Sequence, residues 1–431
     1  MTTDTRHKPK TTKTKTKTKT EKKKDKNENP LLLKDLDKPA QTSLYYGFTP
    51  IKTPQITKED INKLSLVNEC CHTTKKEGNA YFPPPEEKIA VLRTYMENNM
   101  ANMPHPVMLY YKKPFGGQAV AKKDSKTRSF NLEILGSGSS VSEAIAIKAT
   151  LAILEEDGYA DLSVDINSIG DKESITKYEK DLCSYFKKNM SAISAELRLL
   201  FKQDVFEILR CDIEKYSELI ENAPKSMSSL SDSSIQHFKQ VLEYLEVLNI
   251  PYKINNCLVP NKNYCSQTFF EIRGKLDAKK DAVLLAVGTR HNHLSKKAGF
   301  KKEIPMMSLS ANYKILNASE KTTLAKNILK PKFYFIQLGE KAKLKSLHVI
   351  ETLRKVRTPV YHSLTKDKLV GQLTTAENLK ASYVIIMGQK EAMENSVVIR
   401  DMNTRAQDTV SIIELQNYVK TLTQVKQKKN A

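Results

Sequence analysis

The sequence predicts an α/β protein of more than one domain. At 431 residues the chain is long enough for two to three domains of ordinary size. Roughly its last hundred residues alternate strand-like and helix-like segments, a pattern typical of a sheet covered by helices. No segment approaches the roughly 18 to 20 consecutive apolar residues of a membrane span, and the six cysteines include no Cys-x-x-Cys pair. We therefore expect no membrane partner, no metal and a cytoplasmic, reducing location.

Residues 1–38 are expected to form a disordered basic tail, because a Thr-Lys alternation followed by a lysine run has nothing apolar to bury. Residues 1–29 hold eleven of the 70 Lys and Arg residues and four of the 49 acidic residues, which leaves a net charge of +14 on the rest. Excess positive charge on both parts favours a nucleic acid partner. The alternative is a tail that only keeps the protein soluble. The predicted nucleic-acid-binding residues are Lys13, Lys15, Lys17, Lys19, Lys22, Lys23 and Lys24.

Residues 39–329 are expected to form the first folded domain, in which helix and strand patterns follow one another. The patterns predict a helix passing into an extended run within 39–69, helices over 90–100 and 141–157, and strands over 108–111, 130–135, 162–166, 268–273 and 282–287. Residues from about 172 to 248 are charged, free of glycine and helical by periodicity. We expect a helical insertion there.

Residues 331–425 show a different pattern of predicted strands and helices and are expected to form a second domain. The patterns predict strands over 333–338, 360–362 and 383–387, helices over 341–355, 369–379 and 412–422, and a hairpin with strands at 396–400 and 408–411. Strands that alternate with helices predict a mainly parallel sheet.

Short motifs along the chain resemble those of histidyl-tRNA synthetases. In the second domain, the motifs similar to the family's anticodon-binding domain are Gln337-Leu338-Gly339-Glu340, Gly371-Gln372-Leu373 and Val398-Ile399-Arg400-Asp401-Met402. Upstream, in the family's order, stand Tyr46-Gly47-Phe48 with Thr53-Pro54, Val91-Leu92-Arg93-Thr94-Tyr95-Met96-Glu97-Asn98 and Phe130-Asn131-Leu132-Glu133-Ile134-Leu135-Gly136. The resemblance covers about residues 40–425. It implies a class II antiparallel-sheet core with a helical insertion and a C-terminal α/β anticodon-binding-like domain. It also implies tRNA as a partner and a homodimer formed through residues 44–56.

The positions that the resemblance assigns to catalysis depart from the family pattern. In the second motif the family has an arginine just after a Pro-x-Phe, whereas here Pro114-Phe115 is followed by Gly116. Pro260 replaces the arginine of the histidine-specific loop, and Lys314 ends the third motif in place of an ATP-binding arginine. Adenylate formation needs cations around the triphosphate, and lysine does not reproduce a bidentate arginine. The resemblance therefore implies a site that has lost its ATP and Mg²⁺ chemistry, with Lys262, Lys314 and Lys122-Lys123 as partial substitutes.

Part of the family's amino-acid-binding set persists. Glu133 is retained, although Ser129 stands in place of its glutamine partner, and Arg290 is followed by His291 and Asn292 instead of Tyr and Asp. The Arg-Pro-Glu-Gly-Thr element reads Pro84-Pro85-Glu86-Glu87-Lys88. The residual substrate-binding residues that the resemblance implies are Glu86, Glu133, Tyr264 and Arg290.

Other candidate sites are weaker. Cys70-Cys71-His72 does not suit a tetrahedral metal ion, because adjacent cysteines rarely share one. His291 and His293 are expected at a loop surface. Gly136-Ser137-Gly138-Ser139-Ser140 lacks the lysine and the spacing of a P-loop, so we expect a turn in which Ser140 caps the following helix.

Two function hypotheses remain open. The first is a synthetase-like protein that is inactive in adenylation and binds tRNA or another RNA. The alternative is a divergent but active histidine–tRNA ligase, which requires ATP and Mg²⁺. The regulatory subunit of ATP phosphoribosyltransferase resembles the same core but normally lacks the C-terminal domain, and is disfavoured for that reason.

Overall fold

The computed structural model describes residues 32–33, 35–67, 84–112, 127–210, 216–275, 281–315, 323–324, 331–364 and 368–429. Gly116, the seven tail lysines, Lys122-Lys123 and Cys70-Cys71-His72 lie outside these residues. Within the predicted tail, Asp35–Leu36 forms β1, which pairs with β10 (Thr323–Leu324). Asp37 then caps α1 (Lys38–Tyr45) by accepting a hydrogen bond from the Ala40 amide. The last residues of the predicted tail thus include a short strand and the start of a helix.

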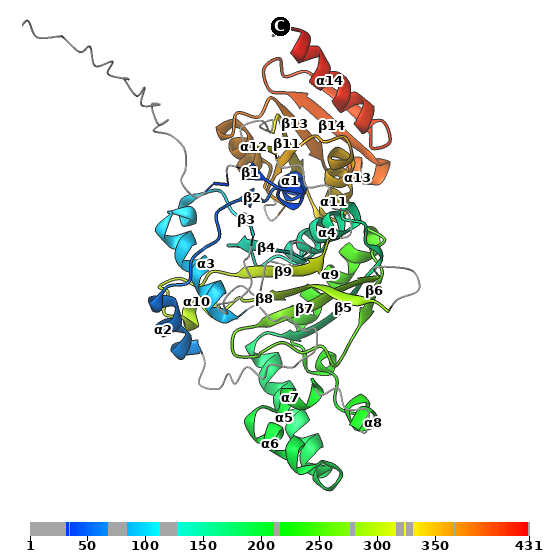
Figure 1. Cartoon of the computed structure of the whole chain (residues 1–431). Coiled ribbons are helices and arrows are strands. Elements are labelled where there is room, and N and C mark those ends of the chain that lie inside the picture. Colours follow the sequence, from blue (N-terminus) through cyan, green and yellow to red (C-terminus); the bar gives the residue numbers. More distant parts are fainter. Residues whose placement is uncertain are drawn as a thin grey trace, which may run out of the picture.

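The first domain is built on an eight-stranded mixed sheet (Figure 1). In spatial order the strands are β2 (Thr49–Pro50), β3 (Val107–Lys112), β4 (Thr127–Leu135), β9 (Met306–Lys314), β8 (Val283–Arg290), β7 (Ser266–Lys275), β5 (Ala160–Gly170) and β6 (Tyr252–Ile254). The six central strands are antiparallel, and the short edge strands β2 and β6 run parallel to their neighbours. The predicted antiparallel core is confirmed, with parallel additions at both edges.

Side-chain alternation gives this sheet one apolar and one polar face. Phe130, Leu132 and Leu309 join the main apolar cluster together with helices α4 (Val141–Glu156) and α9 (Asp232–Val247). The alternate positions of β4 and β9 carry polar groups, including Glu133 and Ser308. Helix α3 (Pro85–Glu97) packs beside β3 in a second apolar cluster that also includes residues of α2 (Lys58–Val67) and α10 (Leu294–Lys297).

The region predicted to be a helical insertion divides between two cores. Helices α5 (Lys172–Lys188), α6 (Ala195–Gln203), α7 (Val205–Leu209) and α8 (Ser217–Glu221) share an apolar cluster of their own. Figure 1 shows these four helices together at one end of the molecule. Helix α9 instead packs on the main sheet, where Phe238 and Val241 are buried.

The second domain has a five-stranded sheet in the order β12-β11-β13-β14-β15. Its elements are β11 (Phe333–Gln337), α11 (Glu340–Lys355), β12 (Val360–His362), α12 (Leu369–Asn378), β13 (Tyr383–Met387), α13 (Gln389–Glu394), β14 (Ser396–Asp401), β15 (Gln407–Ser411) and α14 (Leu415–Lys429). The first three strands are parallel, and β14 and β15 form the predicted hairpin, which is confirmed. None of the described helices is long and apolar enough to cross a membrane.

The two domains are joined by a buried polar cluster between α1, α4 and α11. Arg354 donates two hydrogen bonds to Glu351, at 2.7 and 2.8 Å, and also pairs with Glu156 of α4. The Tyr46 hydroxyl donates to Glu351, and His362 Nε2 lies 2.8 Å from the Tyr46 carbonyl oxygen. Because Tyr46–Glu351, Glu156–Arg354 and Tyr46–His362 are contacts across the domain boundary, the joint fixes how the domains sit together.

Gly47 is the backbone position on which this joint depends. Its φ is +89°, and a Cβ at this position would lie 2.8 Å from His362 Nε2. We predict that Gly47→Ala lowers the free energy of unfolding by about 1 to 3 kcal/mol, since it adds backbone strain and displaces the histidine. Urea unfolding measures this. Gly138→Ala is the matched control, because a Cβ there meets nothing within 4 Å; equal stability of the two variants would contradict the prediction.

Candidate functional site

The polar face of the main sheet is a ladder of small polar side chains across β4 and β9. The cross-strand pairs are Glu133 with Ser308, Asn131 with Ser310, and Ser129 with Asn312. Each pair is hydrogen-bonded, and Ser129 Oγ lies 3.0 Å from Asn312 Oδ1. Glu133 is the one ionisable member of this ladder.

Glu133 is completely buried, and its carboxylate is saturated by contacts from within the chain. Lys88 Nζ lies 2.6 Å from Glu133 Oε1, and neither side chain has any exposed surface. The Tyr111 hydroxyl donates to the same oxygen at 2.9 Å, and the Ser308 hydroxyl donates to Oε2. The carboxylate that the resemblance assigns to substrate is thus bound to a lysine of its own chain.

Lys88 reaches Glu133 from the first turn of α3. This helix begins after Pro84, whose backbone is extended, with Pro85 at its first position, where a missing N–H costs nothing. Lys88 precedes a buried apolar run from Ile89 to Leu92, so the helix face that carries it turns towards the sheet. Glu86, in the same turn, is half-buried, and the structure does not bring it to Glu133. A charged residue at the start of a fully buried helix face is a sequence signal that Lys88 needs a buried partner, but it does not identify Glu133 as that partner.

Arg290, the second retained position, is bound to Glu143 of α4. Arg290 Nε lies 2.8 Å from Glu143 Oε1, and Nη2 contacts the other carboxylate oxygen. Two further hydrogen bonds of 2.9 Å go to the carbonyl oxygens of Ser137 and Ser139. Although burial alone raises the pKa of Glu143, Arg290 and His237 lower it to about 2. Arg290 therefore holds the loop before α4 and has no exposed surface.

Tyr264 and His291 form a stacked pair close to Lys88. Their ring centroids are 5.8 Å apart with an interplanar angle of 20°, and His291 Nδ1 lies 3.0 Å from the Tyr264 carbonyl oxygen. His291 was expected at a loop surface, which is wrong: its amide donates to the Met306 carbonyl, which extends the β8–β9 pairing, and its side chain is buried. Burial first, and the charge of Lys88 second, lower the pKa of His291 to about 3. His293 is exposed and lies 2.6 Å from Glu303.

Pro260, Lys262 and Lys314, which the resemblance assigns to catalysis, lie in different surroundings in the structure. The carbonyl oxygen of Pro260 accepts a 2.7 Å hydrogen bond from Arg210, at the end of α7. Lys262 is bound by Glu179 at 2.5 Å and Asp204 at 3.2 Å, both in the inserted helices. Lys314 ends β9 with an exposed side chain.

Ser140 does not cap α4 as predicted. Its hydroxyl donates instead to Gln240 Oε1 at 2.9 Å, and no side-chain cap is present. The preference of serine for a cap is overridden because α9 packs against this end of α4 and offers a half-buried acceptor.

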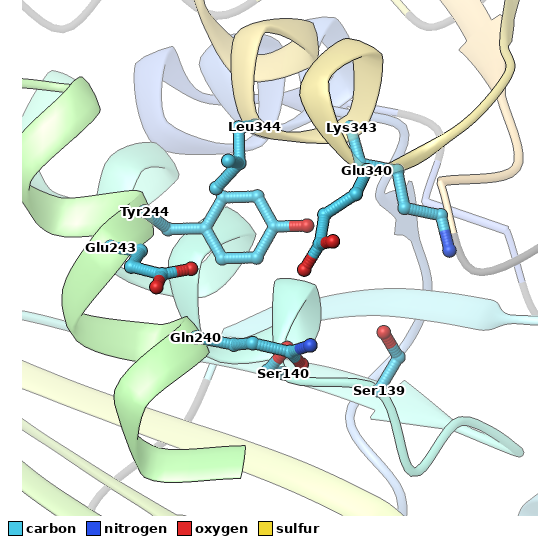
Figure 2. A pocket seen from close by; sticks show the side chains of 8 residues that line it. All are labelled: Ser139, Ser140, Gln240, Glu243, Tyr244, Glu340, Lys343 and Leu344. Carbon is cyan, nitrogen blue, oxygen red and sulfur yellow. The ribbon is translucent and has the colours of Figure 1, made fainter. Parts of the chain in front are cut away.

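A cavity of about 290 Å³ lies between the two domains, and neither Lys88 nor Glu133 lines it (Figure 2). Its lining residues are Ser139, Ser140, Gln240, Glu243, Tyr244, Glu340, Lys343 and Leu344. Two carboxylates against one lysine do not suit an anionic cofactor such as ATP. The described residues contain no group of three side chains arranged to hold a metal ion.

Glu87 makes the site sensitive to pH. Burial raises its pKa to about 7, opposed by Lys88 and assisted by Glu133 and Glu86. The folded state then binds a proton that the unfolded state, with a pKa of about 4.3, has released. This contribution to stability is complete below about pH 4 and is lost as pH rises through 7, a change of about 3 kcal/mol.

We predict that urea unfolding of the full chain shows this fall between pH 5 and pH 8, and that Glu87→Gln removes most of it. Glu86→Gln serves as the control, because Glu86 lies in the same turn and is only half-buried. The same pH dependence in both variants would show that Glu87 is not the group that titrates.

The chain is similar in sequence to histidine–tRNA ligases. Residues 332–422 match the family model of the anticodon binding domain. The histidine–tRNA ligase of Bacillus subtilis is 28% identical over 390 residues, covering 87% of this chain and 91% of that protein. The enzyme of Bacillus licheniformis is 25% identical over 397 residues, covering 89% and 93%. The crystal structure of apo Staphylococcus aureus histidyl-tRNA synthetase is 21% identical with a TM-score of 0.47, covering 88% of this chain and 92% of that one. The chain is thus similar to histidine–tRNA ligases over most of its length, and its second domain matches the anticodon binding domain.

Proposed function

We propose that this protein binds tRNA or a related RNA and does not form an aminoacyl adenylate. The observation that carries the proposal is the state of the buried cations beside the polar face. Lys88 is bound to Glu133, and Arg290 is bound to Glu143. Adenylate formation builds negative charge at a phosphorus atom and requires cations that are positioned and available.

The three positions where the resemblance expects arginine support the same conclusion. Gly116 and Pro260 carry no charge, and Lys314 is a point charge at a strand end. Lys262 was a candidate substitute, but Glu179 and Asp204 neutralise it. Each missing cation would cost about 3 to 4 kcal/mol of transition-state stabilisation in a dry site, by analogy with the loss of one oxyanion-hole donor.

RNA binding is supported by charge and by the domain match. Residues outside the basic segment 1–29 still carry a net charge of +14, which favours a polyanion. The region with a family-model match is the anticodon binding domain, and the relatives are histidine–tRNA ligases. We infer that residues 331–425 select the RNA and that the basic tail adds affinity without selectivity.

The alternative is a divergent but active histidine–tRNA ligase. It is favoured by the presence of Glu133 and by similarity that extends over both domains of the relatives. This activity would require ATP and Mg²⁺ near the polar face, with cations supplied by residues outside the described part of the chain.

A homodimer through residues 44–56 remains a proposal. Within one chain, Tyr46 and Phe48 are buried, and the Pro50 carbonyl oxygen of the edge strand β2 already accepts a hydrogen bond from the Leu33 amide. The proposal therefore rests on the resemblance. Sedimentation velocity at micromolar concentration tests the dimer, and a monomer would refute it. Cell fractionation tests the cytoplasmic location that we expect.

The adenylation assay separates the two functions. We predict no histidine-dependent ATP–pyrophosphate exchange above background for the full chain, and no rescue by Pro260→Arg alone, because two further cations are missing. The B. subtilis enzyme serves as the positive control in the same buffer. Robust exchange by the wild-type chain would establish the alternative.

Salt dependence tests RNA binding. If the tail neutralises phosphates, log affinity for tRNA falls by roughly 0.7 to 0.9 per contacted phosphate per decade of salt. We predict that deletion of residues 1–29 weakens tRNA binding and flattens this slope, while the order of preference among tRNAs is unchanged. A shuffled tail of the same composition should bind like the wild type. Absence of tRNA binding by the full chain at moderate salt would contradict the proposal that this protein binds tRNA.

A further inference from the structure

We propose that Lys88 is a built-in ligand: its ammonium group fills a buried carboxylate pocket around Glu133, and this pocket takes a small primary ammonium ion when the Lys88 side chain is shortened. The inference rests on the proposed function in one respect, since both treat this part of the polar face as closed to substrate.

The geometry is that of a bound ligand. Lys88 Nζ and Glu133 Oε1 are 2.6 Å apart, and both side chains are completely buried. An ion pair removed from water is tolerated only when the remaining lone pairs are also satisfied. Tyr111 and the Ser308 hydroxyl meet this condition at the carboxylate.

The Glu133 carboxylate is held in place by elements other than the one that carries Lys88. Tyr111 belongs to β3, Glu133 to β4 and Ser308 to β9, all within one hydrogen-bonded sheet. Shortening Lys88 therefore removes the cation and leaves the arrangement of acceptors intact. A buried carboxylate without its cation is costly, which gives an added ammonium ion its driving force.

The Tyr264–His291 stack provides a polar aromatic boundary near the lysine. His291 is neutral at pH 7, and the positive charge of Lys88 contributes to lowering its pKa. His291 Nε2 is buried without a hydrogen-bond partner among the described residues. The position of the Lys88 ammonium group is restricted by its attachment to α3. A free ammonium ion does not have this restriction and can donate a hydrogen bond to an acceptor such as His291 Nε2.

The size of the ligand follows from the side chain that it replaces. Lys88→Ala removes the atoms from Cγ to Nζ, which together correspond to propylammonium. The variant should be destabilised, because a buried charge loses its partner and a cavity is left. Propylammonium supplies both the volume and the charge. Propanol supplies a similar volume without the charge, and tetramethylammonium supplies charge without a hydrogen-bond donor.

The test is urea unfolding of full-length Lys88→Ala with and without propylammonium chloride. We expect the unfolding equilibrium constant to fall about tenfold when the ligand is present at ten times its dissociation constant. Wild type, and Lys88→Ala combined with Glu133→Gln, should show no such effect. Equal rescue by propanol or tetramethylammonium chloride, or no rescue of a folded Lys88→Ala, would overturn the inference.

A second pair of variants decides the case if Lys88→Ala does not fold. Lys88→Met keeps the length and removes the charge, so it should be less stable than wild type at pH 7, because it leaves the buried Glu133 carboxylate without its cation. Adding Glu133→Gln should restore most of the loss. If Lys88→Met is as stable as that double variant at pH 7, the inference is wrong.

These measurements contain no ATP, histidine or tRNA. If propylammonium does not stabilise Lys88→Ala, the RNA-binding proposal is unaffected. If the protein does not bind tRNA, the inference about Lys88 is unaffected. Calorimetric binding of propylammonium to the wild-type chain would count against Lys88 as the occupant, whatever the result of the exchange assay.

Discussion

The polar side of this protein is governed by the cost of burying charge. Glu133 and Glu143 both lie in the interior, where an unpaired carboxylate would be severely destabilising. Each is bound by a cation of its own chain, Lys88 in one case and Arg290 in the other. Once these pairs are made, the helices α3 and α4 are fixed against the sheet, and the buried cations beside the polar face are no longer available for an anionic substrate.

The same rule holds the two domains together. Glu351 and Arg354 form an ion pair within α11. Their remaining contacts come from the first domain, where Tyr46 donates a hydrogen bond to Glu351 and Glu156 pairs with Arg354. Apolar residues of both domains also belong to one continuous cluster. A second domain bound in this way presents its surface at a fixed distance and angle from the core, which suits a partner that contacts both.

Periodicity was sufficient to predict most elements, because strands with alternating faces and helices with buried sides leave a local signal. The hairpin of β14 and β15 was found in this way, whereas the antiparallel core was implied by the resemblance to histidyl-tRNA synthetases. Pairings between distant residues leave no such signal. Lys88 is far from Glu133 in sequence, so nothing local showed that they meet. His291 was misplaced for a similar reason, since its burial comes from pairing with Met306 beyond the end of β8.

Glu133 shows why a retained residue is weak evidence for a retained activity. In this chain its carboxylate is needed by the fold, because removing it would leave Lys88 as an uncompensated buried cation. The residue can therefore persist whether or not a substrate is ever bound. The same holds for Arg290, whose guanidinium fixes the turn before α4 through Ser137 and Ser139. What distinguishes a working site from a structural one here is not which residues are present but whether their charges are still available to a ligand.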